Sequence, residues 1–276
     1  MLNQNKPKSF LAWIGGKSQL TDKIIPLMPE HHCYCEVFAG AAWLLFRKQP
    51  SKVEIINDIN SDLVTLYRVV QNHLEEFIRY LKWLLVARDE FDRFMMQEVS
   101  TLTDIQRAVR FYYIAKTGYG ARIVHPTFGI ATSRPSRFNL VRVGEELSDA
   151  HIRLHQVYVE NRPYEQVITR FDKPDTLFYI DPPYFGCEGY YGKGLFNRED
   201  FTRLRDLLAK VKGKFIMSIN DTPEIRELYG QFNILEVPTK YSVSAHENKD
   251  VTELLILNYQ PSDDQMDEFH ARCKRK

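Results

Sequence analysis

Short apolar runs alternate with helical patterns along most of the chain. Apolar runs of four to eight residues predict strands buried on both faces of a parallel sheet. The predicted strands are residues 33–38, 53–57, 156–159, 176–180 and 215–219, with helices at residues 41–46 and 198–211. Strands that alternate with helices indicate the α/β class.

The last part of the chain departs from this alternation. Residues 232–237 and 253–259 predict a closing antiparallel pair of strands, so the sheet is expected to be mixed. Residues 242–250, which lie between the two strands, have few apolar side chains and predict a mobile loop. Residues 185–197 are rich in glycine and predict a second mobile loop, suited to close over a substrate.

A helical period replaces the alternation from residue 61 onward. Apolar side chains then recur at steps of three and four, at Leu63, Leu66, Tyr67, Val70, Leu74, Phe77, Ile78, Leu81 and Leu85. Residues 103–117 predict a further helix. Thr101 and Asp104 resemble a capping box at its start, and Gly118 is a stop signal at its end.

These patterns predict how the chain is divided. We expect one α/β domain, residues 1–60 and 147–276, interrupted by a helical insertion, residues 61–146, which carries a turn-rich segment at residues 118–139. With 276 residues, 44% of them hydrophobic, the chain can bury a sizeable core.

Composition excludes several classes of protein. No apolar run reaches the length of a membrane span, and the N-terminus lacks an apolar signal region, so we expect a cytoplasmic protein with no membrane contact. The cysteines are Cys33, Cys35, Cys187 and Cys273, and their spacing contains no pair of CxxC groups. We therefore expect reduced thiols and no metal site.

Basic residues gather in one part of a chain whose net charge is only +1. Residues 105–144 contain no Asp or Glu, and aromatic side chains lie among the cations. The cations are Arg107, Arg110, Lys116, Arg122, Arg134, Arg137 and Arg142. Such a segment indicates a nucleic-acid surface. The alternative is a helix with a basic solvated face, whose acidic partners lie elsewhere in the fold.

The most informative motif is Asp181-Pro182-Pro183-Tyr184, which follows the strand predicted at residues 176–180. Consecutive prolines cannot continue a strand ladder, so the chain turns at the carboxyl end of that strand, where open α/β sheets bind ligands. A carboxylate, a proline carbonyl and an aromatic ring suit a planar exocyclic amine. The alternative is an ordinary turn whose tyrosine only packs.

A nucleotide-binding βαβ unit is predicted near the start of the chain. Gly40 follows the first strand, and Asp58 ends the second strand 18 residues later, close to the spacing expected for an acid that binds ribose hydroxyls. Gly16-Lys17-Ser18 looks like the end of a phosphate-binding loop. That motif requires glycine at position 11, which is Leu11, so we reject an NTPase.

Five segments in order resemble the Dam-type DNA adenine-N6 methyltransferases, the D12 class or alpha group. They are Phe-Leu-Ala-Trp-Ile-Gly-Gly-Lys at 10–17, Glu-Val-Phe-Ala-Gly-Ala at 36–41, Asn-Asp-Ile-Asn-Ser-Asp-Leu at 57–63, Gly-Tyr-Gly at 118–120 and Ile-Asp-Pro-Pro-Tyr at 180–184. The resemblance implies a Rossmann-like class I methyltransferase fold, with a mixed sheet, helices on both faces and a helical DNA-recognition insertion. The α/β part would then be the catalytic domain.

The resemblance also implies a co-substrate, S-adenosylmethionine, and a DNA duplex as partner. By matching position, the cofactor-binding residues would be Trp13, Lys17, Phe38, Gly40, Asp58 and Asp181. No metal is needed. The sequence does not determine the oligomeric state, and we assume a monomer.

The implied catalytic residues are Asp181, Pro182, Pro183 and Tyr184. Adenine N6 inside a duplex is unreachable, so the base flips out. Tyr184 stacks on the base, while the Asp181 carboxylate and the Pro182 carbonyl accept the two N6–H groups. The amine lone pair then points at the methyl group for direct transfer.

The implied DNA-binding residues are Lys116, Tyr119, Arg122, Arg134 and Arg137. Gly120 follows Tyr119, where GATC-specific relatives usually have Asn-Gly, and residues 121–126 match those relatives poorly. An amide that reads base edges is therefore missing, and we expect relaxed specificity, as in some prophage-borne relatives.

Two further interpretations stay open. One is an RNA adenine-N6 methyltransferase with the same pocket. The other is an inactive DNA-binding protein of methyltransferase fold, although the intact Asp58, Asp181, Pro182 and Tyr184 argue against it. Host-DNA maintenance, restriction partnership and phage anti-restriction all fit the sequence.

Overall fold

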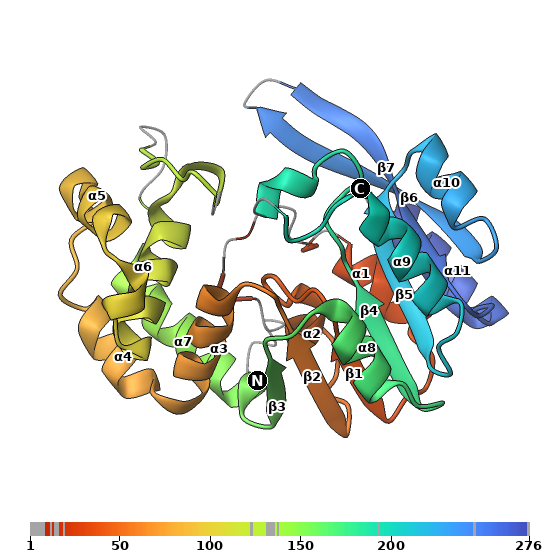
Figure 1. Cartoon of the computed structure of the whole chain (residues 1–276), viewed down its shortest axis with the longest axis horizontal. Helices are drawn as coiled ribbons and strands as arrows, with labels where there is room; N and C mark the ends of the chain where they lie inside the picture. Colours follow the sequence, from red (N-terminus) through yellow and green to blue (C-terminus); the bar gives the residue numbers. More distant parts are fainter. Residues whose placement is uncertain are drawn as a thin grey trace.

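A computed structural model gives the fold. It describes residues 9–11, 13, 17–18, 20–121, 124–130, 136, 138–191, 194–244 and 247–274. Figure 1 shows a twisted sheet with helices packed along it, and a group of helices beside one of its edges. In the part of the chain just given, no helix is long and apolar enough to cross a membrane.

The sheet has seven strands in the order β3-β2-β1-β4-β5-β7-β6. All neighbouring pairs are parallel except those of β7, which is antiparallel to both β5 and β6. The strands are β1 (Cys33–Glu36), β2 (Val53–Asn57), β3 (Val157–Glu160), β4 (Thr176–Ile180), β5 (Lys214–Asn220), β6 (Asn233–Ser244) and β7 (Glu247–Leu257). The predicted α/β fold with a mixed sheet is confirmed.

Helices cover both faces of the sheet. On the first face lie α1 (Thr21–Ile24), α2 (Trp43–Arg47) and α11 (Asp263–Lys274), and on the second lie α8 (Tyr164–Phe171), α9 (Arg198–Leu208) and α10 (Pro223–Leu228). Successive strand residues alternate between the two cores. Tyr179 lies in the first core, whereas Phe178 and Ile180 lie in the second. Because both faces are buried, the strands read as continuous apolar runs.

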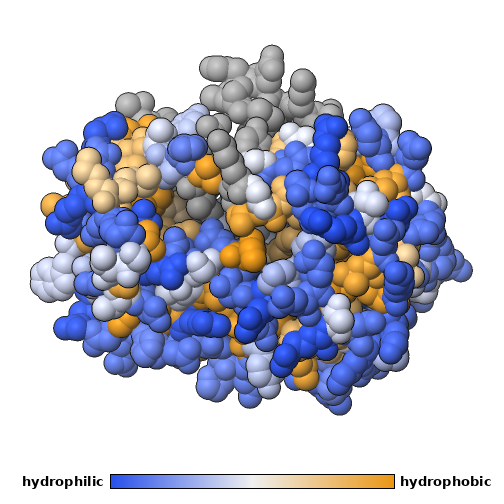
Figure 2. Space-filling model, viewed as in Figure 1, coloured by the Kyte–Doolittle hydropathy of each residue, from blue (hydrophilic) through white to orange (hydrophobic). Residues whose placement is uncertain are grey.

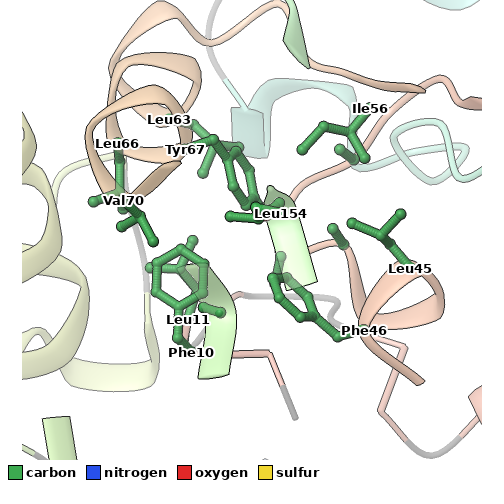
Figure 3. Close-up of a cluster of buried hydrophobic side chains, with 14 of the residues drawn as sticks. Phe10, Leu11, Leu45, Phe46, Ile56, Leu63, Leu66, Tyr67, Val70 and Leu154 are labelled. Carbon is green, nitrogen blue, oxygen red and sulfur yellow. The ribbon is translucent and has the colours of Figure 1, made fainter. Parts of the chain in front are cut away.

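The helical part is formed by α3 (Ser61–Asn72), α4 (Leu74–Leu81), α5 (Arg88–Met96), α6 (Asp104–Thr117) and α7 (Leu140–Leu154), with short 3-10 turns at η2 (Val99–Thr101) and η3 (Tyr119–Ala121). The remaining 3-10 turns are η1 (Ile25–Leu27) and η4 (Glu188–Tyr191). Figure 3 shows how Leu63, Leu66, Tyr67 and Val70 of α3 face side chains that flank the sheet. The helical part therefore shares a core with the sheet. The division at residue 146, which falls inside α7, stays a prediction.

Two predicted details are wrong. The capping box of α6 is formed by Thr103 and Gln106, not by Thr101 and Asp104. The Thr103 hydroxyl accepts from the Gln106 amide at 3.3 Å, and the Gln106 side chain accepts from the Thr103 amide at 3.0 Å. The motif needs a spacing of three from the residue before the helix, and the helix begins at Asp104.

The predicted loop at residues 242–250 is the second correction. β6 runs on to Ser244 and β7 begins at Glu247, with Lys240 paired to Asp250 and Ser242 to Asn248. Backbone ladder bonds do not require apolar side chains, so a two-stranded ribbon continues past the end of β5.

Candidate active site

A cavity of about 380 Å³ lies at the carboxyl ends of β1, β2 and β4. Because β1 lies between the other two strands, the turns that follow them meet at one edge of the sheet. Every residue predicted to bind the cofactor lines this cavity: Trp13, Lys17, Phe38, Gly40, Asp58 and Asp181.

The entrance of the cavity carries apolar side chains. Ile59 and Leu195 line it and are exposed. Figure 2 shows a mostly hydrophilic face, with a hydrophobic group near its centre, between the helical part and the sheet. Such a surface, with a few convergent polar groups behind it, is typical of a small-molecule site.

Gly40 is held in a conformation and a space that only glycine fits. Its φ is +47°, and a Cβ there would lie 2.8 Å from Nε1 of Trp13. Its amide donates to Oδ2 of Asp58 at 2.9 Å, and its carbonyl accepts from the Tyr67 hydroxyl at 2.7 Å. The turn after β1 is therefore fixed against the carboxylate that follows β2.

Asp58 is an acceptor held in place by backbone amides. Its Oδ1 accepts from the Asn60 amide at 2.9 Å, and the side chain of Asn60 in turn caps α3. Burial raises the pKa of Asp58, while the amides of Asn60 and Gly40 oppose that rise. The carboxylate is thus oriented before any ligand arrives.

Three aromatic rings form one wall of the cavity. Phe38 lies 5.6 Å from Tyr164 and 5.9 Å from Phe196, and the latter two rings are also 5.9 Å apart, between centroids. The sequence analysis missed Tyr164 and Phe196. Tyr164 comes just after the carboxyl end of β3, so the strand-end rule that found Asp58 also applied to it.

Lys17 connects the two ends of the Asp-Pro-Pro-Tyr motif. Its ammonium lies 2.7 Å from Oδ1 of Asp181, donates to the Tyr184 hydroxyl at 2.8 Å, and is 4.4 Å from the centre of that ring. Pro183 lines the cavity, and Pro182 is buried beside it. The lysine that resembled a phosphate-loop residue therefore lies against the motif.

Asp181 accepts from a second donor. The Ser218 hydroxyl of β5 donates to the same Oδ1 at 3.0 Å and lies 2.7 Å from the Tyr179 hydroxyl. Burial raises the pKa of Asp181 to about 6, although the Lys17 ammonium acts to lower it. The carboxylate is thus ionised at neutral pH and titrates just below it.

Asn220 fixes the chain after the motif. Its side chain accepts from the Phe185 amide at 2.9 Å and donates to the Phe185 carbonyl at 3.0 Å. These two hydrogen bonds attach the turn after β4 to the end of β5 and so fix the position of Tyr184. A polar residue directly after the strand predicted at residues 215–219 was the available signal.

Glu36, the last residue of β1, is a buried acid that the sequence analysis also missed. It lines the cavity and accepts from the Tyr34 hydroxyl at 2.9 Å and from the Leu45 amide at 3.2 Å. Burial raises the pKa of Glu36 to about 8. The cavity floor can therefore hold a proton near neutral pH.

The predicted DNA contacts differ in how the structure places them. Tyr119 is 66% exposed at the end of α6, whereas Lys116 is 10% exposed and lies 2.8 Å from Glu146. Arg107 is paired with Asp62. These two cations thus have acidic partners from other helices, as the alternative interpretation expected. Arg122, Arg134 and Arg137 lie outside the described residues.

Comparison with known proteins adds a family. Residues 13–243 match the D12 class N6 adenine-specific DNA methyltransferases. A type II methyltransferase from Lactococcus lactis subsp. cremoris is 28% identical, over 94% of this chain and 99% of that protein. The DNA adenine methylase of Escherichia coli K12 is 27% identical over 93% and 96%, and a type II methyltransferase of Paramecium bursaria Chlorella virus NC1A is 25% identical over 91% and 100%.

Proposed function

The chain belongs to the D12 class of N6 adenine-specific DNA methyltransferases, which methylate adenine N6 with S-adenosylmethionine, and from this premise we propose roles for its residues and a relaxed sequence specificity. The observation that carries the proposal is the position of Asp181. It lines the same cavity as Asp58 and Gly40, and it shares the Lys17 ammonium with Tyr184. A cofactor subsite and an amine-binding motif thus adjoin.

The cavity fits S-adenosylmethionine by the chemistry of its donors and its shape. Asp58 is an oriented acceptor for ribose hydroxyls, and Phe38 with Tyr164 and Phe196 offers an aromatic wall for the adenine ring. Gly40 lines the cavity without a side chain, so the methionine part can approach its backbone closely. When bound, the cofactor supplies an electrophilic methyl group on a positively charged sulfur.

Asp181 and Pro182 orient the target amine. Flipping the adenine out of the duplex costs a few kcal/mol, and stacking on Tyr184 returns ~1–3 kcal/mol. The Asp181 carboxylate and the Pro182 carbonyl then each accept one N6–H, which aims the nitrogen lone pair toward the cofactor subsite. Positioning and electrostatics supply the rate, because no covalent intermediate with the protein is needed.

We assign DNA recognition to residues 61–146 and catalysis to residues 1–60 and 147–276. The exposure of Tyr119 supports a proposed contact with a base, and Arg122, Arg134 and Arg137 are the proposed phosphate or base contacts. Lys116 would have to release Glu146 to join them. Gly120, with φ +65°, offers no side chain beside Tyr119 to read a base edge, which supports relaxed specificity.

Methylation of an unmethylated plasmid, mapped adenine by adenine, tests this proposal. Modified adenines in nearly every sequence context are the expected result. Confinement to one short motif would overturn the relaxed specificity and leave the catalytic roles standing. Parallel reactions with duplex DNA and RNA, at equal adenine concentration, should label the DNA.

A further inference from the structure

An antiparallel strand brings a carboxylate to the site that the parallel strands do not supply. β7 runs opposite to β5, so the first residue of β7 that pairs with β5 lies at the edge where the parallel strands end. Glu253 pairs with Asn220 there and is 1% exposed. Its Oε2 lies 4.0 Å from the Lys17 ammonium.

Lys17 is consequently placed between the buried carboxylate of Glu253 and the half-buried carboxylate of Asp181. Its ammonium is 2.7 Å from Asp181 and 4.0 Å from Glu253, and its side chain is 5% exposed. Three strands next to one another in the sheet, β4, β5 and β7, thus contribute to one polar cluster. The groups that face Asp181 are Lys17, Glu253, Ser218 of β5, Tyr179 of β4 and, at longer range, Glu36 of β1.

We propose that Glu253 is a positioning residue for methyl transfer: it shares the Lys17 ammonium with Asp181, so that this cation engages the Asp181 carboxylate less completely and the carboxylate can accept the N6–H of the target adenine. The inference rests on the proposed role of Asp181. Glu253 touches neither the base nor the cofactor in this scheme and acts through Lys17.

The physical reason is that the Lys17 ammonium interacts with both Asp181 and Glu253 where little water screens the charges. If Glu253 lost its charge, the attraction of Lys17 toward β7 would weaken, and the target amine would have to compete with a tighter Lys17–Asp181 ion pair. The loss of a neighbouring negative charge would also make Asp181 easier to ionise. Removal of Glu253 should therefore slow the reaction while extending it to lower pH.

The test is the pH profile of the single-turnover methylation rate constant in Glu253→Gln, at saturating plasmid and S-adenosylmethionine. We expect a rate about tenfold lower at neutral pH, and an acid limb displaced to lower pH by roughly half a unit or more. Lys17→Met removes the opposite charge and should displace the acid limb to higher pH. Opposite displacements distinguish this role from a general loss of structure.

Glu236→Gln is the matched control. Glu236 lies on β6, the strand next to β7, carries the same charge, is exposed and pairs with Arg226 instead. We expect its rate and its acid limb to equal those of the wild-type chain. Thermal unfolding and the quenching of tryptophan fluorescence by S-adenosylmethionine verify that each variant folds and binds the cofactor.

An acid limb at the wild-type pH in a folded, cofactor-binding Glu253→Gln protein would overturn the inference, as would equal displacements in Glu236→Gln. If Glu253→Gln does not fold, Glu253→Asp decides, because a carboxylate one methylene further back should displace the limb in the same direction by less. A limb unchanged in that variant also overturns the inference. Failure of the proposed function shows separately, as methylation by Asp181→Ala.

Discussion

The edge of the sheet and the helical part handle charge in opposite ways. At the sheet edge, buried Lys17 lies between half-buried Asp181 and buried Glu253. In the helical part, Arg107 and Lys116 are partnered by acids of other helices, while the aromatic Tyr119 is exposed. Catalysis is thus assigned to strand ends that hold polar groups in place, whereas recognition is assigned to loop residues on a helical scaffold.

Replacement of Asp181 should have the largest effect and is the strongest test of this comparison. If the buried edge carries the reaction, Asp181→Ala should lower the methylation rate by roughly a thousandfold or more, because no other group accepts from the amine in its place. Thermal unfolding should stay near that of the wild-type chain. Methylation assayed with labelled S-adenosylmethionine checks this, and full activity in a folded variant would refute the mechanism.

Two variants of Tyr184 distinguish the contribution of its ring to the methylation rate from that of its hydroxyl. Tyr184→Ala removes the stacking surface, worth ~1–3 kcal/mol, and should slow methylation roughly 10- to 100-fold. Tyr184→Phe keeps the ring and removes only the hydroxyl that Lys17 contacts, so it should retain most of the rate. Equal losses in the two variants would show that the Lys17 contact, rather than stacking, is the function of Tyr184.

The pH dependence of the methylation rate tests whether the ionised form of Asp181 is required. Burial raises the pKa of Asp181 to about 6, and the reaction needs its ionised form. The rate should therefore rise with pH through about 6 and be roughly tenfold lower at pH 5 than at pH 8. DNA binding, measured by fluorescence anisotropy over the same range, is the control and should lack this step. A flat rate profile would contradict the assignment.

The smallest effect is expected in the recognition region. Replacement of Arg137 by Gln should weaken DNA binding to all sequences alike and reduce the salt slope of log K by about one, since one phosphate contact is lost. Arg170→Gln, which removes an exposed cation of α8, should leave the slope unchanged. Binding isotherms at several salt concentrations check both. An unchanged slope for Arg137→Gln would show that its side chain makes no phosphate contact.

Local sequence information was enough to locate the cavity. Gly40, Asp58 and Asp181 were identified because each follows a predicted strand, and the carboxyl ends of neighbouring parallel strands must meet. The α/β class followed from apolar runs buried on both faces. The capping error at Thr103 and the loop predicted at residues 242–250 arose where a boundary or a backbone ladder, not side-chain polarity, sets the structure.

What the sequence alone determined is the set of turns that line the cavity, because strand ends and their motifs are local features. Only the tertiary structure decided which groups act on them. Lys17 and Glu253 come from opposite ends of the chain, and their approach depends on the antiparallel direction of β7. Burial then shifts the pKa values of the groups in contact, because the energy of an ionised group depends on distances and hydration. A linear sequence pattern contains neither.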